Sequence, residues 1–206
     1  MPQRCDLSPG RGLPRGRLKC LVMPFPSGYP GDLERAVTLR DGSVVRIRPI
    51  RPDDAPSLQG LHSRLSHESA YQRFFAIVRR LPPDWARALA NVDYQRRLAL
   101  VVEPGAGGEL IGVGRYEPTN EQDTVEVAFV VQDSWQNRGL GTILFDAILQ
   151  AAATRSYRRF RAYVLNDNKR MLDLIRRFTR VESSKTEQGV TDLVFTLAPE
   201  KVPGAT

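Results

Sequence analysis

Residues 124–152, TVEVAFVVQDSWQNRGLGTILFDAILQAA, predict a strand, a tight loop and a helix. The apolar residues on either side of Glu126 first alternate with other residues, as they do in a strand with one buried face. From Leu140 onward the apolar residues recur at the spacing of a helix. Gly139 and Gly141 lie at the start of this helix. Glycine there lets a ligand approach the backbone, and the free N–H groups of the first helical turn favour a phosphate.

The positions of the glycines distinguish between the known types of phosphate-binding loop. A Walker loop needs Gly-Lys-Ser or Gly-Lys-Thr after four spacer residues, and a dinucleotide fingerprint needs a third glycine; residues 136–142 have neither. The remaining pattern, Gln-x-x-Gly-x-Gly directly after a strand, resembles the acetyl-CoA pyrophosphate loop of the GCN5-related N-acetyltransferase (GNAT) superfamily. The alternative interpretation is an ordinary glycine-containing connection of an α/β domain.

Length and composition suit one domain with tails. The 206 residues are 41% hydrophobic, and no apolar run approaches the ~20 residues that span a bilayer. The N-terminus lacks the continuous apolar segment of a signal peptide, so we expect a cytoplasmic protein without a membrane partner. The net charge is +7, of which +4 lies in residues 1–30. The mild excess in the rest of the chain does not predict a nucleic-acid partner, and an anionic cofactor accounts for it as well.

The cysteines and histidines do not match a metal site. Cys5 and Cys20 precede the expected domain, and His62 and His67 lie far from them in the sequence. We therefore predict neither a metal ion nor a disulfide. Both histidines fall in expected helices, and we interpret them as surface or half-buried residues rather than catalytic groups.

The predicted elements occupy residues 36–198. The expected strands are 37–39, 44–48, 98–103, 109–116, 124–131, 159–165 and 192–197, and the expected helices are 54–65, 66–75, 82–91, 140–152 and 168–178. This order predicts an α/β fold with a mixed, mostly antiparallel central sheet flanked by helices. By resemblance it is the GNAT acyl-CoA N-acyltransferase fold. We expect residues 1–30, rich in Pro, Gly and Arg, to be a disordered basic tail, with Met23 as an alternative start, and residues 199–206 to be a C-terminal tail.

Further stretches resemble a narrower group. Residues 69–75 (SAYQRFF), 91–100 (NVDYQRRLAL), 39–42 (LRDG) and 47–54 (IRPIRPDD) are similar to segments of the acetyltransferase domain of bacterial protein lysine acetyltransferases. Such enzymes often carry a second domain, for which this chain has no room, so it resembles their single-domain members. The resemblance implies acetyl-CoA as donor, a protein lysine as acceptor and acyl-CoA synthetases as targets.

Glu126 is the candidate catalytic base. A lysine ammonium must lose a proton before it attacks a thioester, and a nearby carboxylate can take that proton directly or through water. Glu126 stands on the strand before the loop and matches the catalytic glutamate of the resembled enzymes. Because its neighbours are apolar, we expect partial burial that raises its pKa. Glu121 and Asp123, on the preceding loop, are the alternatives.

The remaining site residues are expected to bind acetyl-CoA. Backbone groups of the strand should pair with the pantetheine arm and hold the oxyanion, and the loop should clamp the pyrophosphate with Arg138 supplying positive charge. Asn168 is either a cofactor contact, as in the resembled family, or a helix cap. The expected cofactor-binding residues are Phe129, Val130, Val131, Gln136, Asn137, Arg138, Gly139, Leu140, Gly141, Thr142 and Asn168.

One position departs from the family pattern. Many acetyltransferases place a tyrosine seven residues after the asparagine, as acid for the leaving thiolate, but this chain has Ile175. Either the thiolate leaves without a side-chain acid, which we favour, or Tyr163 serves.

Three functions remain open from the sequence. The first is a protein lysine acetyltransferase, the second acetylates a small amine, and the third is a non-catalytic module that binds acyl-CoA. The sequence does not predict the oligomeric state.

Overall fold

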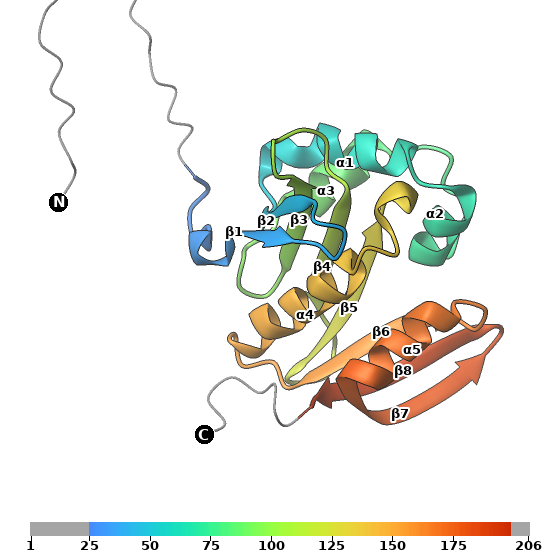
Figure 1. The fold of residues 1–206 in the computed structure, drawn as a ribbon. Helices are drawn as coiled ribbons and strands as arrows, with labels where there is room; N and C mark the ends of the chain where they lie inside the picture. The colour runs from blue at the N-terminus through green and yellow to red at the C-terminus, as the bar shows by residue number, and fades with distance from the viewer. Residues whose placement is uncertain (1–24, 199–206) are drawn as a thin grey trace, which may run out of the picture.

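An eight-stranded sheet in the order β1-β2-β3-β4-β5-β6-β8-β7 runs through the computed structural model, which describes residues 25–198 (Figure 1). All neighbouring strands are antiparallel except β5 and β6, which are parallel, so the predicted mixed and mostly antiparallel sheet is confirmed. The strands are β1 (Arg35–Thr38), β2 (Val44–Pro49), β3 (Leu98–Pro104), β4 (Gly112–Pro118), β5 (Thr124–Val131), β6 (Arg159–Leu165), β7 (Thr179–Glu187) and β8 (Val190–Leu197). The helices are α1 (Ala55–Ser63), α2 (His67–Phe74), α3 (Pro83–Ala90), α4 (Leu140–Ala153) and α5 (Lys169–Phe178), with short 3-10 turns at Gly31–Leu33, Pro52–Asp54 and Asp133–Trp135.

Helices cover both faces of the sheet. Gly114 on β4 lies beneath α4, where an added Cβ would lie 3.0 Å from Leu144 and 3.1 Å from Ile148. On the opposite face, Val113 and Val130 line a small cavity together with residues of α1, α2 and α3. The alternation of side chains along a strand therefore assigns α4 to one face and α1–α3 to the other.

The centre of the sheet opens between β5 and β6. On one side β5 pairs with β4 over seven residue pairs, from Gly112↔Val131 to Pro118↔Val125. On the other side it pairs with β6 over only three, from Thr124↔Arg159 to Glu126↔Arg161. Beyond Glu126 the two strands separate, as Figure 1 shows between β5 and the β6–β8–β7 group. The C-terminal half of β5 therefore has a free edge.

Strand β7 is missing from the sequence prediction. It lies at the edge of the sheet, and after Thr179 most of its side chains are exposed. Its residues, TRVESSKTE, are mostly polar, so the apolar alternation that identifies a half-buried strand does not occur. Pairing with β8, rather than burial, holds it in place.

The N-terminal boundary also differs from expectation. The rings of Phe25 and Tyr29 stack with their centroids 4.8 Å apart, and the Arg51 guanidinium lies over both. Tyr29 packs against the core, and Glu34 accepts its hydroxyl hydrogen bond, so residues 25–30, expected in the disordered tail, are part of the domain. Residues 1–24, which include Cys5, Cys20 and Met23, and residues 199–206 lie outside the described residues.

Candidate active site

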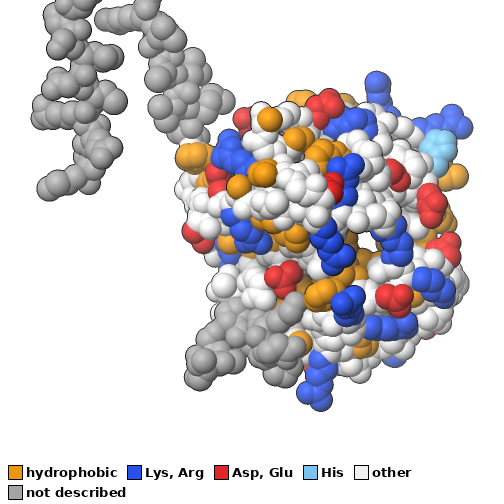
Figure 2. All heavy atoms as spheres, in the orientation of Figure 1, with side chains coloured by type: hydrophobic (Ala, Val, Ile, Leu, Met, Phe, Trp, Pro, Cys, Tyr) orange, Lys and Arg blue, Asp and Glu red, His pale blue; other side chains and the backbone are white. Residues whose placement is uncertain are grey.

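A cleft of about 1030 Å³ occupies the opening between β5 and β6. Its walls come from α2, β5, the loop before α4, β6 and the start of α5. Figure 2 shows a hollow on this side of the molecule, with hydrophobic side chains inside and Lys and Arg side chains at the rim. Because one wall is the free edge of β5, an extended ligand can pair with the backbone there as an added strand would.

The loop at one end of the cleft exposes the N-terminus of α4. Asn137 has φ +64° and Gly139 has φ +91°, so two residues adopt the left-handed backbone conformation before the helix begins at Leu140. Glycine suits such a φ because it lacks a Cβ. No side chain caps α4, so its first N–H groups are available to an anion, and the helix dipole favours one there.

Three cations surround this loop. Lys169 and Arg170 at the start of α5 line the cleft, and Arg170 donates hydrogen bonds to Asn137 Oδ1 at 2.6 Å and Gln136 Oε1 at 3.3 Å. The third is Arg40 from the β1–β2 turn, whose Nε would lie 3.4 Å from a Cβ at Gly139. Sequence reasoning missed all three, because Arg40 is distant in the sequence and the other two look like ordinary helix residues.

The Arg138 side chain does not line the cleft. Its guanidinium donates to Asp41 Oδ2 and to the Ser134 carbonyl, each at 2.9 Å, and it lies over the Trp135 ring. The Arg40 N–H donates to the Arg138 carbonyl at 3.4 Å. Arg138 therefore holds the β1–β2 turn, and Arg40 with it, against the loop. The Arg138 guanidinium forms its ion pair with Asp41.

Helix α2 is fastened to the same loop. Asp133 accepts hydrogen bonds from the Ser66 N–H, the Ser66 hydroxyl and the Ser69 hydroxyl at 2.7–2.8 Å. Burial alone would raise the pKa of Asp133, but these hydrogen bonds outweigh it and hold the pKa below its ordinary value. Gln136 adds a second link, since its Nε2 donates to Ser69 Oγ and to the Val131 carbonyl. The position of α2 thus depends on the loop.

Asn168 caps α5 and reaches across the cleft. Its Oδ1 accepts from the Met171 N–H at 3.1 Å, so the cap, one of its two expected roles, is present, and its Nδ2 donates to Gln72 of α2 at 3.2 Å. Contact with the cofactor stays a prediction. Ile175, in the second turn of α5, is fully buried, whereas Tyr163 lines the cleft with 41% of its surface exposed.

Glu126 lines the cleft with an uncommitted carboxylate. Its strand neighbours Val125 and Val127 are buried, as expected, but Glu126 itself is exposed rather than partly buried. Glu126 forms the last pair with β6 before the two strands separate, and its side chain faces the open cleft. Among residues 25–198, nothing forms a hydrogen bond or ion pair with its side chain.

The charged residues at the two register positions beside Glu126 are both paired. On β4, the register neighbour Glu117 accepts from Arg97 Nε at 2.6 Å and from Arg115 Nε at 2.9 Å. On β6, the register neighbour Arg161 binds Asp192 and also Glu121, at 2.8 and 2.9 Å. Glu121 is therefore occupied, and neither it nor Asp123, the two alternative bases, lines the cleft.

The structure brings most of the predicted site residues to this one cleft. Those that line it are Glu126, Phe129, Val130, Val131, Gln136, Asn137, Gly139, Gly141, Thr142 and Asn168. Leu140 and Arg138 do not; the Leu140 side chain is buried in the core, so only its backbone can take part. Within residues 25–198, no group of three His, Cys, Asp or Glu side chains could hold a metal ion, and none of the helices has the length and hydropathy to cross a membrane.

His62 lies outside the cleft. It is only 6% exposed, more buried than expected from the sequence, and burial lowers its pKa. It lines a separate cavity of about 30 Å³ beneath α1 and α2, where its Nε2 has no hydrogen-bond partner among the described residues. That volume is close to the space of one water molecule. His67 begins α2 and is exposed, as expected.

The fold and the cleft define a class of protein. The acetyltransferase (GNAT) family matches residues 66–179, a range that contains α2, Glu126, the glycine loop and α5. The chain belongs to this family, whose members use acetyl-CoA as co-substrate.

Individual relatives narrow the resemblance. The chain is 32% identical over 168 residues to Acetyltransferase Pat of Mycolicibacterium smegmatis, an alignment that covers 81% of this chain and 47% of that protein. It is 30% identical to Acetyltransferase PA5475 of Pseudomonas aeruginosa, with 66% and 75% covered. The chain thus spans about half the length of the first relative and three quarters of the second.

Solved structures of acetyltransferases and acyltransferases are also similar to this chain. The GNAT domain of S. lividans PAT is 36% identical, with a TM-score of 0.75 and coverage of 82% of this chain and 99% of that one. A cAMP-binding acyltransferase from Mycobacterium smegmatis is 28% identical, with a TM-score of 0.56, and the chain covers 49% of its length. The chain therefore resembles the GNAT domain of bacterial protein lysine acetyltransferases, as the sequence predicts.

Proposed function

We propose that this enzyme transfers the acetyl group of acetyl-CoA to the side-chain amine of a protein lysine, with Glu126 as general base. The observation that carries the proposal is the free carboxylate of Glu126 at the point where β5 and β6 separate. The same strand leads directly to the anion-binding end of α4. Base and phosphate site therefore lie along one wall of one cleft.

The cleft offers what acetyl-CoA requires. Its phosphates suit the α4 N-terminus and the cations Arg40, Lys169 and Arg170, and its pantetheine arm suits the free edge of β5. The acceptor ammonium then loses its proton to Glu126, and the free amine attacks the thioester carbonyl. Backbone N–H groups of Phe129 to Val131 hold the negative charge that develops on the carbonyl oxygen. Because Ile175 is buried, Tyr163 is the side chain in the cleft that could protonate the leaving thiolate, if one is needed.

A protein acceptor is supported by the relatives. Two relatives that cover about four fifths of this chain are Acetyltransferase Pat and the GNAT domain of S. lividans PAT, and acyl-CoA synthetases are the protein targets that the resemblance suggests. Glu126 lines the cleft and is exposed to solvent, so a lysine presented by another protein can reach it.

The test compares acceptors. Purified protein is incubated with acetyl-CoA and, separately, with lysine peptides, an acyl-CoA synthetase and a panel of small amines, and coenzyme A release is measured. We expect release with the protein or peptide acceptors, and a lysine acetylated in the product by mass spectrometry. Release with small amines alone would assign a small-molecule acetyltransferase. Binding of acetyl-CoA without release with any acceptor would assign a non-catalytic module.

A further inference from the structure

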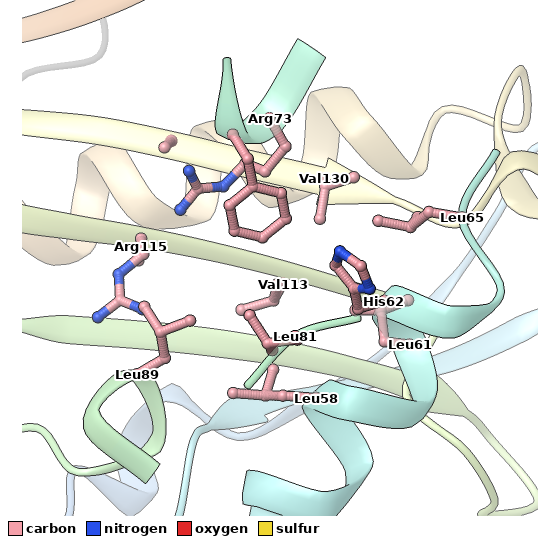
Figure 3. Close-up of a pocket in the computed structure, with 12 residues that line it drawn as sticks. Leu58, Leu61, His62, Leu65, Arg73, Leu81, Leu89, Val113, Arg115 and Val130 are labelled. Atoms are coloured by element: carbon pink, nitrogen blue, oxygen red, sulfur yellow. The ribbon is translucent and has the colours of Figure 1, made fainter. Parts of the chain in front are cut away.

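Arg73 is a half-buried cation without a counter-ion. It comes from the last turn of α2 and lines both the cleft and the small cavity beneath α2. Its guanidinium lies 5.2 Å from the centroid of the Phe74 ring, and no described residue forms a hydrogen bond or ion pair with it. Figure 3 shows the Arg73 side chain reaching down from α2 toward Arg115, at the opposite end of the cavity from His62. A guanidinium removed from water without an anionic partner is unfavourable, and an anion that binds it relieves that cost.

The surrounding carboxylates do not pair with Arg73. Arg115 is only 5% exposed, and its partner Glu117 is shared with Arg97. Burial and the neighbouring Arg115 lower the pKa of Arg73 to about 10, against the opposite effect of Glu126 and Glu117, so the side chain is still cationic at neutral pH. The guanidiniums of Arg97 and Arg115 share Glu117, and Asp93 also attracts Arg97, which leaves Arg73 without a carboxylate partner among the described residues. On the β6 side, by contrast, the single guanidinium of Arg161 binds two carboxylates, those of Asp192 and Glu121.

We propose that Arg73 binds a carboxylate on the acceptor, so that the preferred acceptor is a lysine next to an Asp or Glu residue. This rests on the proposed function, because it assigns the acceptor of the same site. An ammonium that approaches Glu126 alone meets the unpaired positive charge of Arg73 on the α2 side. An acceptor that also brings a carboxylate places its amine at Glu126 and its carboxylate at Arg73, and both charges are then matched.

The position of Arg73 excludes the cofactor phosphates as its partner. The N-terminal turn of α2 contacts the phosphate loop through Ser66 and Ser69, whereas Arg73 lies in the last turn and interacts electrostatically with Glu126. The planar fork of a guanidinium matches a carboxylate with two parallel hydrogen bonds, which gives the site its geometric selectivity.

The chain supplies a matched control for Arg73. Arg79 lies six residues further on, is exposed, and lines neither cavity. Arg73→Gln and Arg79→Gln remove the same charge from nearby positions, so a non-specific electrostatic effect would appear in both variants.

The experiment uses two lysine peptides that differ only in Glu or Gln beside the lysine, together with free lysine and lysine amide. Binding to the protein saturated with coenzyme A is measured first, since this readout does not need turnover, and kcat/KM with acetyl-CoA second. We expect wild type and Arg79→Gln to prefer the Glu peptide by at least about tenfold, which is about 1.4 kcal/mol. We expect Arg73→Gln to lose that preference while its binding of acetyl-CoA stays within about twofold, and Arg73→Lys to keep part of the preference.

Each outcome decides the inference. Equal binding of the two peptides by wild type, or the same preference in wild type and Arg73→Gln, overturns it. A preference that depends on Arg73 but appears only between free lysine and lysine amide moves the carboxylate to a free amino acid and overturns the protein acceptor. An Arg73-dependent binding preference without acetylation of any amine supports the carboxylate site and contradicts the proposed catalytic function, so the two failures are distinguishable.

Discussion

The proposed role of Glu126 as general base depends on the residues around it. The charged residues at the adjacent register positions, Glu117 and Arg161, already have partners, and the separation of β5 from β6 keeps the carboxylate open to the cleft. We expect Glu126→Gln to keep acetyl-CoA affinity and to lower kcat at least tenfold, because the amide is nearly isosteric but cannot accept the proton. Calorimetry measures the first quantity and coenzyme A release the second. Turnover near that of wild type would show that Glu126 is not the base.

Arg40 acts at the other end of the cleft. Its guanidinium lies beside Gly139, with no hydrogen bond or ion pair to another side chain of the described residues. We expect Arg40→Gln to weaken coenzyme A binding about three- to tenfold, with less dependence on salt, because a phosphate contact is lost. Arg35→Gln, an exposed change on β1 outside the cleft, serves as the control. Equal affinity of Arg40→Gln and Arg35→Gln, measured by calorimetry at low and moderate salt, contradicts a role for Arg40 in binding.

At the scale of elements, hydrogen bonds to Asp133 connect α2 to the loop before α4. The ionised carboxylate accepts three hydrogen bonds from Ser66 and Ser69, and its pKa is lowered in the folded state. Its contribution to stability is therefore present above the ordinary pKa of an aspartate, about 4, and is lost as the pH falls through the lowered value. We expect Asp133→Asn to reduce the free energy of unfolding by about 1 kcal/mol at neutral pH. The difference from wild type should disappear in acid.

Urea unfolding of wild type and Asp133→Asn across this pH range checks the expectation. Asp32→Asn is the control, since Asp32 is exposed and has no hydrogen bond or ion pair among the described residues. A destabilisation of Asp133→Asn that is the same at all pH values would show that the charge of Asp133 does not stabilise the link.

A substitution at Gly114 tests how closely α4 must pack on β4. A Cβ at Gly114 would lie 3.0 Å from Leu144 and 3.1 Å from Ile148, both buried residues of α4. We expect Gly114→Ala to destabilise the fold by about 1–3 kcal/mol, because the helix must move away from the strand. Gly31→Ala, where an added Cβ meets nothing within 4 Å, should change little in the same urea titration. Similar stability of the two variants would mean that α4 adjusts without cost.

The elements also show what a sequence can predict. The strand, loop and helix of residues 124–152 were predictable because period and motif agree over a continuous stretch, and the Ser66 cap of α2 was predictable for the same local reason. Strand β7 was not, since it is held by pairing and not by an apolar face. Arg40 and Arg73 were not, because their roles depend on where the turn and α2 come to rest against distant parts of the chain. Arg138 shows the converse, a charge beside the motif whose side chain binds Asp41.

At the scale of the whole molecule, the cleft lies between two parts of one sheet that are joined by only three residue pairs of β5 and β6. A ligand that contacts the α4 N-terminus on one side and α5 on the other adds to the side-chain hydrogen bonds that Asn168 and Arg170 already make across the cleft (Figure 1). Binding to the folded state alone must raise the apparent stability, by about 2.7 kcal/mol at a coenzyme A concentration one hundred times Kd. Hydrogen exchange should slow in both β5 and α5.

A substitution of Gly139 tests whether the loop before α4 provides the stabilisation that coenzyme A gives on binding. Its φ of +91° makes Gly139→Ala strained, and the added Cβ would also lie 3.4 Å from Arg40 Nε. Gly107→Ala carries similar strain, with φ +82°, at a turn where a Cβ meets nothing within 4 Å. We expect both variants to lose about 1 kcal/mol of stability without ligand. Only Gly107→Ala should regain the full thermal shift when coenzyme A is added at the concentration that saturates wild type. Because the strain is matched, an equal shift in Gly139→Ala would mean that the energy of binding resides elsewhere in the cleft, and the backbone amides at the start of α4 would lose their assigned role.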